Sequence, residues 1–224
     1  MAHNGNNDHL VQTHERLVTL MMRVIMEKVG VKFDAHKLKP FIDFSFIVME
    51  HIVIKLPRLF PFYLAFYEDM AGKEIEMAKI TADDRVLHIG CGPIPATSIL
   101  IAQKTGAKVL GIDYNPVSVQ LAHRCVGHLP KHSRPAIVHA DAYTYPVDTF
   151  TVIVVSQGIK PSVGVLEHIN ASMMPTARLV YRTSSSSDGN LADTDRFLLT
   201  LFQIKRMVHH KKNGLLISLL LQKT

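Results

Sequence analysis

Two glycines and an aspartate stand at spacings that suit nucleotide binding. Gly90 and Gly92 form a G-x-G turn after the apolar residues 86–89, and Asp113 follows Gly90 by 23 residues. Glycine permits backbone angles and a close ligand approach that side chains forbid. The helix expected after the turn offers free N–H groups to a ligand, and a carboxylate at this distance can accept hydrogen bonds from ribose hydroxyls. The pattern predicts the nucleotide-binding half of a doubly wound α/β fold.

The residues beside the glycines indicate which nucleotide binds. The dinucleotide pattern is G-x-G-x-x-G, but here Pro93 follows the second glycine and Pro95 stands in place of the third. Proline cannot replace the small residue that lets helix and strand pack closely around a pyrophosphate. S-adenosylmethionine (SAM) has no phosphate, so the shortened pattern favours SAM over NAD.

Two short motifs carry a family resemblance. The run His88-Ile89-Gly90-Cys91-Gly92-Pro93-Ile94-Pro95-Ala96-Thr97 resembles the I-G-x-G-P-L-P-x-T signature of the nicotianamine synthase-like branch of class I SAM-dependent methyltransferases. Tyr181-Arg182-Thr183, at the end of a later expected strand, supports it, and the resemblance covers residues 60–190. Most members of the class have an acidic residue where His88 stands, so this chain departs from a usual contact near the methionine end of SAM.

The resemblance implies a SAM-dependent transferase and leaves three functions open. Methyl transfer to a small-molecule acceptor, catalysed by a class I methyltransferase, is the leading expectation because that class is so large. The alternative is aminobutyrate (3-amino-3-carboxypropyl) transfer, since nicotianamine synthases move this part of SAM and not its methyl group. A non-catalytic SAM-binding protein is the second alternative. The sulfonium is already an activated leaving group, so an enzyme mainly aligns a nucleophile and excludes water.

The expected cofactor-binding residues lie at the ends of expected strands. Asp141 and Ala142 follow the third strand, and the resemblance places them beside the adenine amino group. Ser156 and Gln157 follow the fourth strand, at the edge where ligands gather in α/β folds. The full predicted set is His88, Gly90, Cys91, Gly92, Pro93, Thr97, Asp113, Tyr114, Asp141, Ala142, Ser156 and Gln157.

The helix before the glycine turn supplies the candidate catalytic residues, Tyr67 and Glu68. In nicotianamine synthase-like proteins this helix helps to close the site over SAM. Glu68 would bind a substrate amine, or act as a general base if burial raised its pKa toward neutrality. A surface glutamate is the alternative reading, and Glu74 and Glu76 compete for the same role.

The chain divides near residue 80 into a predicted N-terminal helical cap, residues 1–80, and a SAM-binding domain, residues 81–224. The domain is expected to be α/β, with the Rossmann-like seven-stranded sheet of methyltransferases. Asn213-Gly214 is a strong hairpin signal between two final strands, and it matches the antiparallel last strand of that sheet. The predicted helices and strands are residues 9–28, 40–55 and 61–79 for the helices, and residues 85–89, 108–112, 136–139, 150–155, 178–182, 203–210 and 215–221 for the strands.

The composition of the chain indicates which classes of binding partner to expect. The net charge is +6, but the basic residues are scattered, so a small-molecule acceptor is expected and nucleic acid is not. Residues 41–66 are apolar, yet charges and two prolines interrupt them, which favours cap helices over a membrane span. Attachment to a membrane surface and assembly into a homo-oligomer stay open.

The cysteines and histidines bear on the cellular setting of the protein and on metal binding. The two cysteines, Cys91 and Cys125, and an N-terminus without the order of a signal peptide predict a reducing, cytoplasmic setting. His128 and His132 are four residues apart, but Pro130 between them argues against a pair on one helix face. No metal site is therefore expected.

Overall fold

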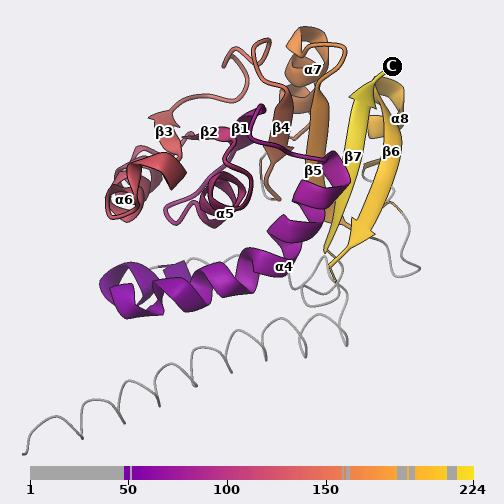
Figure 1. Cartoon of the computed structure of the whole chain (residues 1–224). Helices are drawn as coiled ribbons and strands as arrows, with labels where there is room; N and C mark the ends of the chain where they lie inside the picture. The colour runs from indigo at the N-terminus through magenta and orange to yellow at the C-terminus, as the bar shows by residue number, and fades with distance from the viewer. Residues whose placement is uncertain are drawn as a thin grey trace, which may run out of the picture. The chain divides into compact units, whose positions relative to one another are not determined.

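The computed structural model covers the whole chain and describes residues 48–50, 52–157, 159, 162–185, 191, 195–210 and 216–224 (Figure 1). It divides into two compact units, of which the second runs from Leu64 to His210 and from Leu215 to Thr224. The predicted helix at 9–28 and most of that at 40–55 lie outside the described residues, so the cap of residues 1–80 stays a prediction. The third predicted helix is confirmed: a 3₁₀ turn, η2 (Pro57–Leu59), leads into α4 (Phe60–Ala78).

The second unit contains the seven-stranded sheet that the sequence predicts, in the order β3-β2-β1-β4-β5-β7-β6. The first five strands are parallel, and β7 is antiparallel to both β5 and β6. This is the strand order and polarity of the Rossmann-like methyltransferase sheet. The strands are β1 (Arg85–Ile89), β2 (Lys108–Asp113), β3 (Ala136–His139), β4 (Val152–Val155), β5 (Arg178–Ser184), β6 (Phe202–His209) and β7 (Leu216–Lys223).

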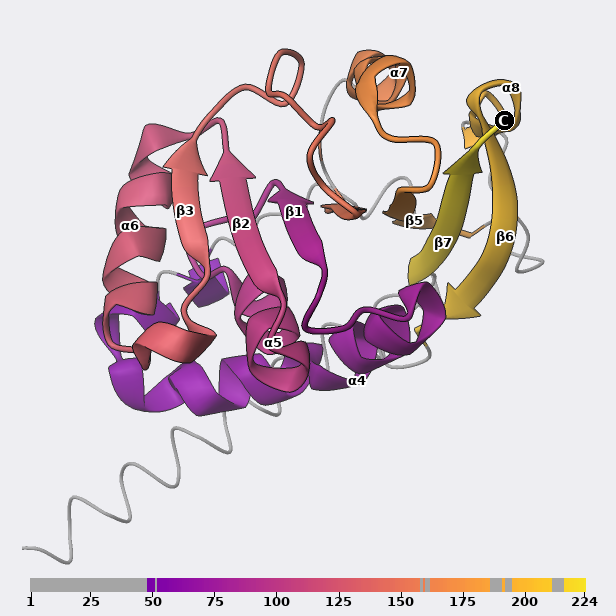
Figure 2. The same cartoon turned by 45° about the horizontal axis from the view of Figure 1, so that its top comes forward.

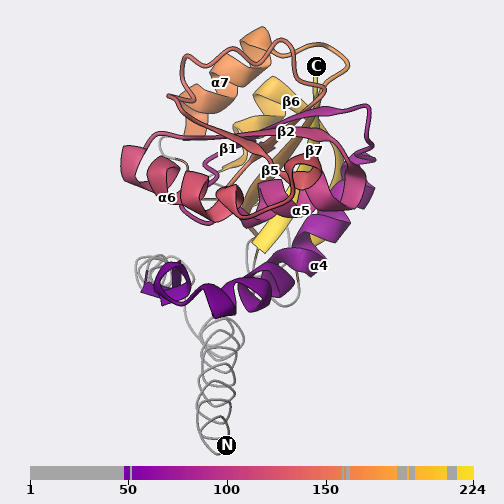
Figure 3. The same ribbon diagram turned by 60° about the vertical axis from the view of Figure 1, so that its left-hand side comes forward.

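Helices cover both faces of the sheet within this unit, with α5 and α6 on one face and α7 on the other (Figures 2 and 3). Because strand side chains alternate between faces, β4 sends Val152 and Val154 into one core and Ile153 and Val155 into the other. The remaining helical segments are α5 (Ala96–Thr105), α6 (Pro116–Gly127), η3 (Lys131–Ser133), α7 (Ser162–Ser172) and α8 (Leu198–Leu201).

Local signals explain where the two helices next to the glycine turn begin and end. Gly106 takes a left-handed conformation, φ 72°, and closes α5 by donating its N–H to the Ala102 carbonyl. Asn115 caps α6, because its side-chain oxygen accepts from the N–H groups of Val117 and Ser118, and proline fills the first helical position. The end of α5 therefore leads directly into the start of β2, and α6 begins directly after the end of β2.

The last two strands confirm the predicted pairing of the C-terminal segment. The predicted turn at Asn213-Gly214 itself lies outside the described residues. Among the helices that the structure describes, none is long and apolar enough to cross a membrane.

Candidate cofactor site

The glycine turn lies at the carboxyl edge of the sheet, where the parallel strands end. Gly90 and Gly92 both have positive φ angles, 75° and 69°. Glycine is favoured at position 90 by this conformation, and a Cβ atom there would also require Cδ1 of Ile159 to move. The N–H groups of Gly90 and Cys91 both donate to the Ile112 carbonyl, at 2.9 and 3.1 Å. The turn is thereby fixed against the end of β2.

Asp113 is held beside this turn by two backbone donors. Its Oδ2 accepts from the Gly92 N–H at 2.8 Å, and its Oδ1 accepts from the Asn115 N–H at 2.9 Å. A carboxylate has about four acceptor positions, so roughly two are left for a ligand. The half-buried side chain is thus oriented in advance, as a carboxylate that receives two ribose hydroxyls must be.

Cys91 contributes packing to the turn. Its side chain is 5 % exposed and lies against Gly111, where an added Cβ atom would come within 3.0 Å of the Cys91 Cβ. Burial, with the Asp113 charge adding to it, raises the pKa of the thiol to about 12. The thiol therefore stays protonated at neutral pH and is no nucleophile.

His88 joins three elements beneath the turn. Its Nδ1 lies 2.8 Å from Ser98 Oγ on α5, and its Nε2 lies 2.8 Å from Ser156 Oγ after β4. Burial and, secondly, the Arg182 charge lower the pKa of the imidazole to about 3. A neutral ring has one donor and one acceptor nitrogen, which suits two hydroxyl partners. His88 is only 2 % exposed, so the structure places it under the turn, bound to these serines.

Thr97 is also buried, and it belongs to a polar network that sequence reasoning missed. Its hydroxyl accepts from Arg182 Nη2 at 2.9 Å, and Arg182 forms a two-bond ion pair with Glu74 of α4. Although burial alone would raise it, the charge and hydrogen bonds of Arg182 hold the pKa of Glu74 below its ordinary value. Glu74 and Arg182 are 108 positions apart, so no local pattern could have paired them.

The other predicted cofactor residues lie at the same edge. Asp141 is exposed and begins a turn after β3, with its Oδ1 accepting from the Tyr143 N–H at 2.9 Å. Tyr114 is 75 % exposed, and its carbonyl bonds to His139 Nε2. Gln157 donates through Nε2 to Ser184 Oγ at 2.8 Å, which ties the end of β4 to the end of β5. Their contacts with a ligand stay predictions.

The two predicted catalytic residues differ in their surroundings. Tyr67 is half-buried, and its phenol is close enough to influence the pKa of Arg182. Glu68 is 56 % exposed and pairs with Lys104 at 2.7 Å, in the last turn of α5 and therefore at the end of that helix far from the glycine turn. The structure supplies this surface contact for Glu68, and its catalytic role stays a prediction.

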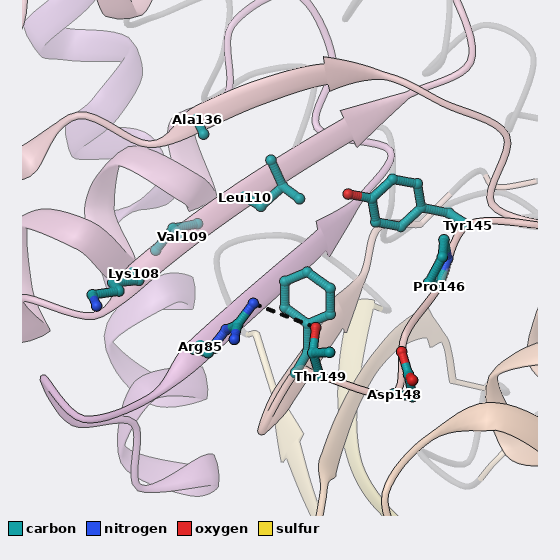
Figure 4. Close-up of a pocket in the computed structure, with 10 residues that line it drawn as sticks. Arg85, Lys108, Val109, Leu110, Ala136, Tyr145, Pro146, Asp148 and Thr149 are labelled. Atoms are coloured by element: carbon teal, nitrogen blue, oxygen red, sulfur yellow. Dashed lines mark hydrogen bonds between the residues drawn. The ribbon is translucent and has the colours of Figure 1, made fainter.

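A hollow lies at the opposite, amino edge of the sheet. This pocket of about 520 Å³ is lined by the first residues of three strands, Arg85, Lys108 and Ala136, and by residues 145, 146 and 148–150 (Figure 4). The Arg85 guanidinium lies over the Phe150 ring at 5.8 Å and donates to Thr149 Oγ1 at 3.4 Å. None of the predicted site residues lines it. Within the described part of the chain, no three His, Cys, Asp or Glu side chains group as a metal ion would need.

The sheet order, the glycine turn and the placed carboxylate together define the fold of class I SAM-dependent methyltransferases. The family described as nicotianamine synthase protein matches residues 13–217, and the chain belongs to this family. Both findings confirm the resemblance that the sequence indicated. The residues at the carboxyl edge fit the SAM that the family implies, because Asp113 is oriented by two backbone N–H groups and both glycines of the turn have positive φ angles.

Solved structures show the same fold at low identity. A mutant of MtNAS in complex with S-adenosylmethionine superposes with a TM-score of 0.63 and 17 % identity, over 98 % of this chain and 80 % of that one. The glycopeptide N-methyltransferase MtfA with S-adenosylhomocysteine gives a TM-score of 0.61 at 10 % identity, over 70 % of this chain and 90 % of that one.

A curated relative from Yersinia pestis, "L-histidine 2-aminobutanoyltransferase", is 33 % identical over 67 residues. That stretch is 30 % of this chain and 25 % of the relative, so the match spans about a quarter of the relative's length. The family and this relative favour the alternative reaction over the leading expectation of methyl transfer.

Proposed function

We propose that this protein transfers the aminobutyrate group of SAM to the amine of a small-molecule acceptor. The observation that carries the proposal is the family match over residues 13–217, on a fold whose carboxyl edge holds an oriented Asp113 and the glycine turn. The relative named as an aminobutanoyltransferase supports the same group, and MtNAS has been crystallised with MTA and tNA. Methyl transfer has no comparable support from within the family.

Different residues at the carboxyl edge would bind different parts of SAM. Asp113 accepts the ribose hydroxyls through its remaining lone pairs, and Asp141 accepts from the adenine amino group. The glycine turn and the residues after β4, Ser156 and Gln157, line the rest of the cofactor site. SAM itself supplies a sulfonium that activates its attached carbons toward an amine. The protein therefore needs to align the acceptor and to exclude water, without a strong catalytic base.

The acceptor is proposed to be an amino acid or a similar small amine. The name of the relative from Yersinia pestis makes L-histidine the first compound to try. The reaction balances simply: the acceptor nitrogen forms a bond to the aminobutyrate carbon and loses a proton, the carbon–sulfur bond breaks, and methylthioadenosine leaves. Tyr67 lies on α4 near Arg182 and is the described residue that we place nearest to the acceptor.

Product identity tests the proposal. The enzyme is incubated with L-histidine, or a panel of amino acids, and with SAM labelled separately on the methyl and the aminobutyrate carbons. We expect methylthioadenosine and an acceptor that carries the aminobutyrate label. S-adenosylhomocysteine with a methylated acceptor would overturn the proposal in favour of methyl transfer. Binding of SAM with no turnover across the panel would favour a non-catalytic SAM-binding protein.

A further inference from the structure

The first turn of α5, directly after the glycine turn, is held by hydrogen bonds from outside the helix. The residue at its N-cap position, Pro95, provides no side-chain hydrogen bond. Instead, Thr97 is bound by Arg182 of β5, and Ser98 is bound by His88 of β1. Both Thr97 and Ser98 are almost fully buried. The helix that follows the glycine turn is therefore fixed by two side chains of other elements, Arg182 and His88.

The Arg182 side of this arrangement is the more elaborate. Arg182 is 5 % exposed, and its Nε and Nη2 donate to the two oxygens of Glu74 at 2.7 and 2.6 Å. Ser218 of β7 also donates to Glu74 Oε1, at 2.6 Å, and its own oxygen lies 2.8 Å from His210 Nε2. Ser218 belongs to β7 and His210 directly follows β6. Side chains of α4, α5, β5 and β7 therefore meet around one buried ion pair.

Stability alone is a poor reason for such a pair. Removing two charges from water costs about as much as their attraction returns, and apolar residues of the same size often serve as well. A guanidinium is also unfavourable near a helix N-terminus, which already carries a partial positive charge. A planar guanidinium instead fixes the direction of its hydrogen bonds. Because two of its donors are held by Glu74, the Nη2 group has one orientation from which it can donate to Thr97.

We propose that Arg182, oriented by Glu74, is a positioning residue for the cofactor turn and acts through Thr97. Arg182 bonds to Thr97 in the first turn of α5. The backbone of residues 93–96 joins that turn of helix to Gly92, whose N–H donates to the Asp113 carboxylate. This arrangement replaces the third glycine, which in dinucleotide-binding folds sets how closely helix and strand pack. The inference rests on the proposed binding of SAM at this edge.

The test removes the Thr97 hydroxyl and measures affinity for S-adenosylhomocysteine by calorimetry. Thr97→Val should weaken binding roughly tenfold, the scale of a lost hydrogen bond to a charged group, in a chain that still folds. Its thermal midpoint should fall by a few degrees, because one buried Arg182 donor loses its acceptor. Thr97→Ser should restore binding. Thr105→Val is the matched control: its hydroxyl bonds within the other end of the same helix and should not affect affinity.

A double-mutant cycle separates positioning from direct contact with the ligand. Arg182→Lys keeps the charge but loses the fork, so it should weaken binding, and adding Thr97→Val should weaken it no further. Additive losses would mean that Thr97 touches the ligand itself and would overturn the inference, as would wild-type affinity in Thr97→Val. If Arg182→Lys fails to fold, Glu74→Asp, which shortens the carboxylate that orients the guanidinium, takes its place in the same cycle. A wild-type protein that binds neither SAM nor S-adenosylhomocysteine would refute the proposed function and the inference with it.

Discussion

The glycine turn at the carboxyl edge of the parallel sheet and the pocket at its amino edge are surrounded by different kinds of polar side chain. At the carboxyl edge the polar side chains are buried and joined: His88 lies between two serines, and Arg182 between Glu74 and Thr97. At the amino edge the structure has a pocket of about 520 Å³, but its two cations, Arg85 and Lys108, are exposed and pair with no acidic side chain in the described residues.

The difference shows that a hollow and a site are distinct features. Burying a polar group costs free energy unless its hydrogen bonds are made, so a chain keeps such groups where their position matters. At the carboxyl edge, several buried polar side chains have this cost, and they lie around the glycine turn and the Asp113 carboxylate. The pocket at the amino edge carries none of it, since Arg85 and Lys108 remain in water. The buried carboxylate at that edge, Asp84, is held by Arg178 and Thr151 and does not line the pocket.

The largest expected effect compares two glutamates of the same helix. Glu74→Gln leaves the Arg182 charge buried without its partner, so we expect a loss of about 3–5 kcal/mol in the free energy of unfolding. Glu68→Gln breaks an exposed pair with Lys104 and should cost less than about 1 kcal/mol. Urea denaturation of both variants measures the contrast. Equal losses would mean that burial does not separate the two pairs.

Next comes the glycine turn, compared with a glycine inside α4. Gly90→Ala forces a side chain into a left-handed conformation and against Ile159, and should cost about 1–3 kcal/mol. Gly72→Ala meets nothing within 4 Å and should stabilise the helix by about 0.5–1 kcal/mol. Thermal unfolding of the two variants checks the signs. A stabilising Gly90→Ala would refute the geometry assigned to the turn.

The smallest effect is a dependence on pH. Because the pKa of His88 falls from 6.5 to about 3 on folding, the unfolded chain binds a proton between those values that the folded chain does not. Its contribution is therefore complete above about pH 6.5 and is lost at about 1.4 kcal/mol per pH unit as the pH falls toward 3. His88→Gln should reduce the change in the free energy of unfolding between pH 6 and 5, measured by urea denaturation, by about 1 kcal/mol.

The control for the histidine is His123→Gln, an exposed residue on α6. It should leave the dependence on pH as in the wild type. If His88→Gln has the same dependence of stability on pH as the wild type, then folding does not lower the pKa of His88, and this account of the histidine is wrong.

The fold was largely predictable because its signals are local. The predicted strands at 85–89 and 136–139 have the observed bounds, since short runs rich in Val and Ile mark them. β4 begins at Val152 and not at residue 150, because Phe150 closes a turn with its N–H on the Val147 carbonyl. β5 continues two residues beyond its predicted end, to Ser184, where it still pairs with Leu216 of β7.

The candidate site was predictable only in part. Gly90, Gly92 and Asp113 stand within one strand–turn–helix–strand unit, so their spacing alone indicated that they meet. The partners of His88 and Arg182 come from separate elements, and Ser218 is 144 positions from Glu74, so only the folded chain brings them together. The expectation of methyl transfer rested on the size of the class, and family membership favours aminobutyrate transfer.

The central claim, that the carboxyl edge and not the amino edge binds SAM, is tested by one calorimetric comparison. S-adenosylhomocysteine is titrated into the wild type, Asp113→Asn and Asp148→Asn, which change one carboxylate at each edge by the same atoms. We expect Asp113→Asn to bind about 10- to 150-fold more weakly, the equivalent of about 1.5–3 kcal/mol for hydrogen bonds to a charged group. Asp148→Asn should bind as the wild type does. Wild-type affinity in Asp113→Asn, or a comparable loss in Asp148→Asn, would contradict the account.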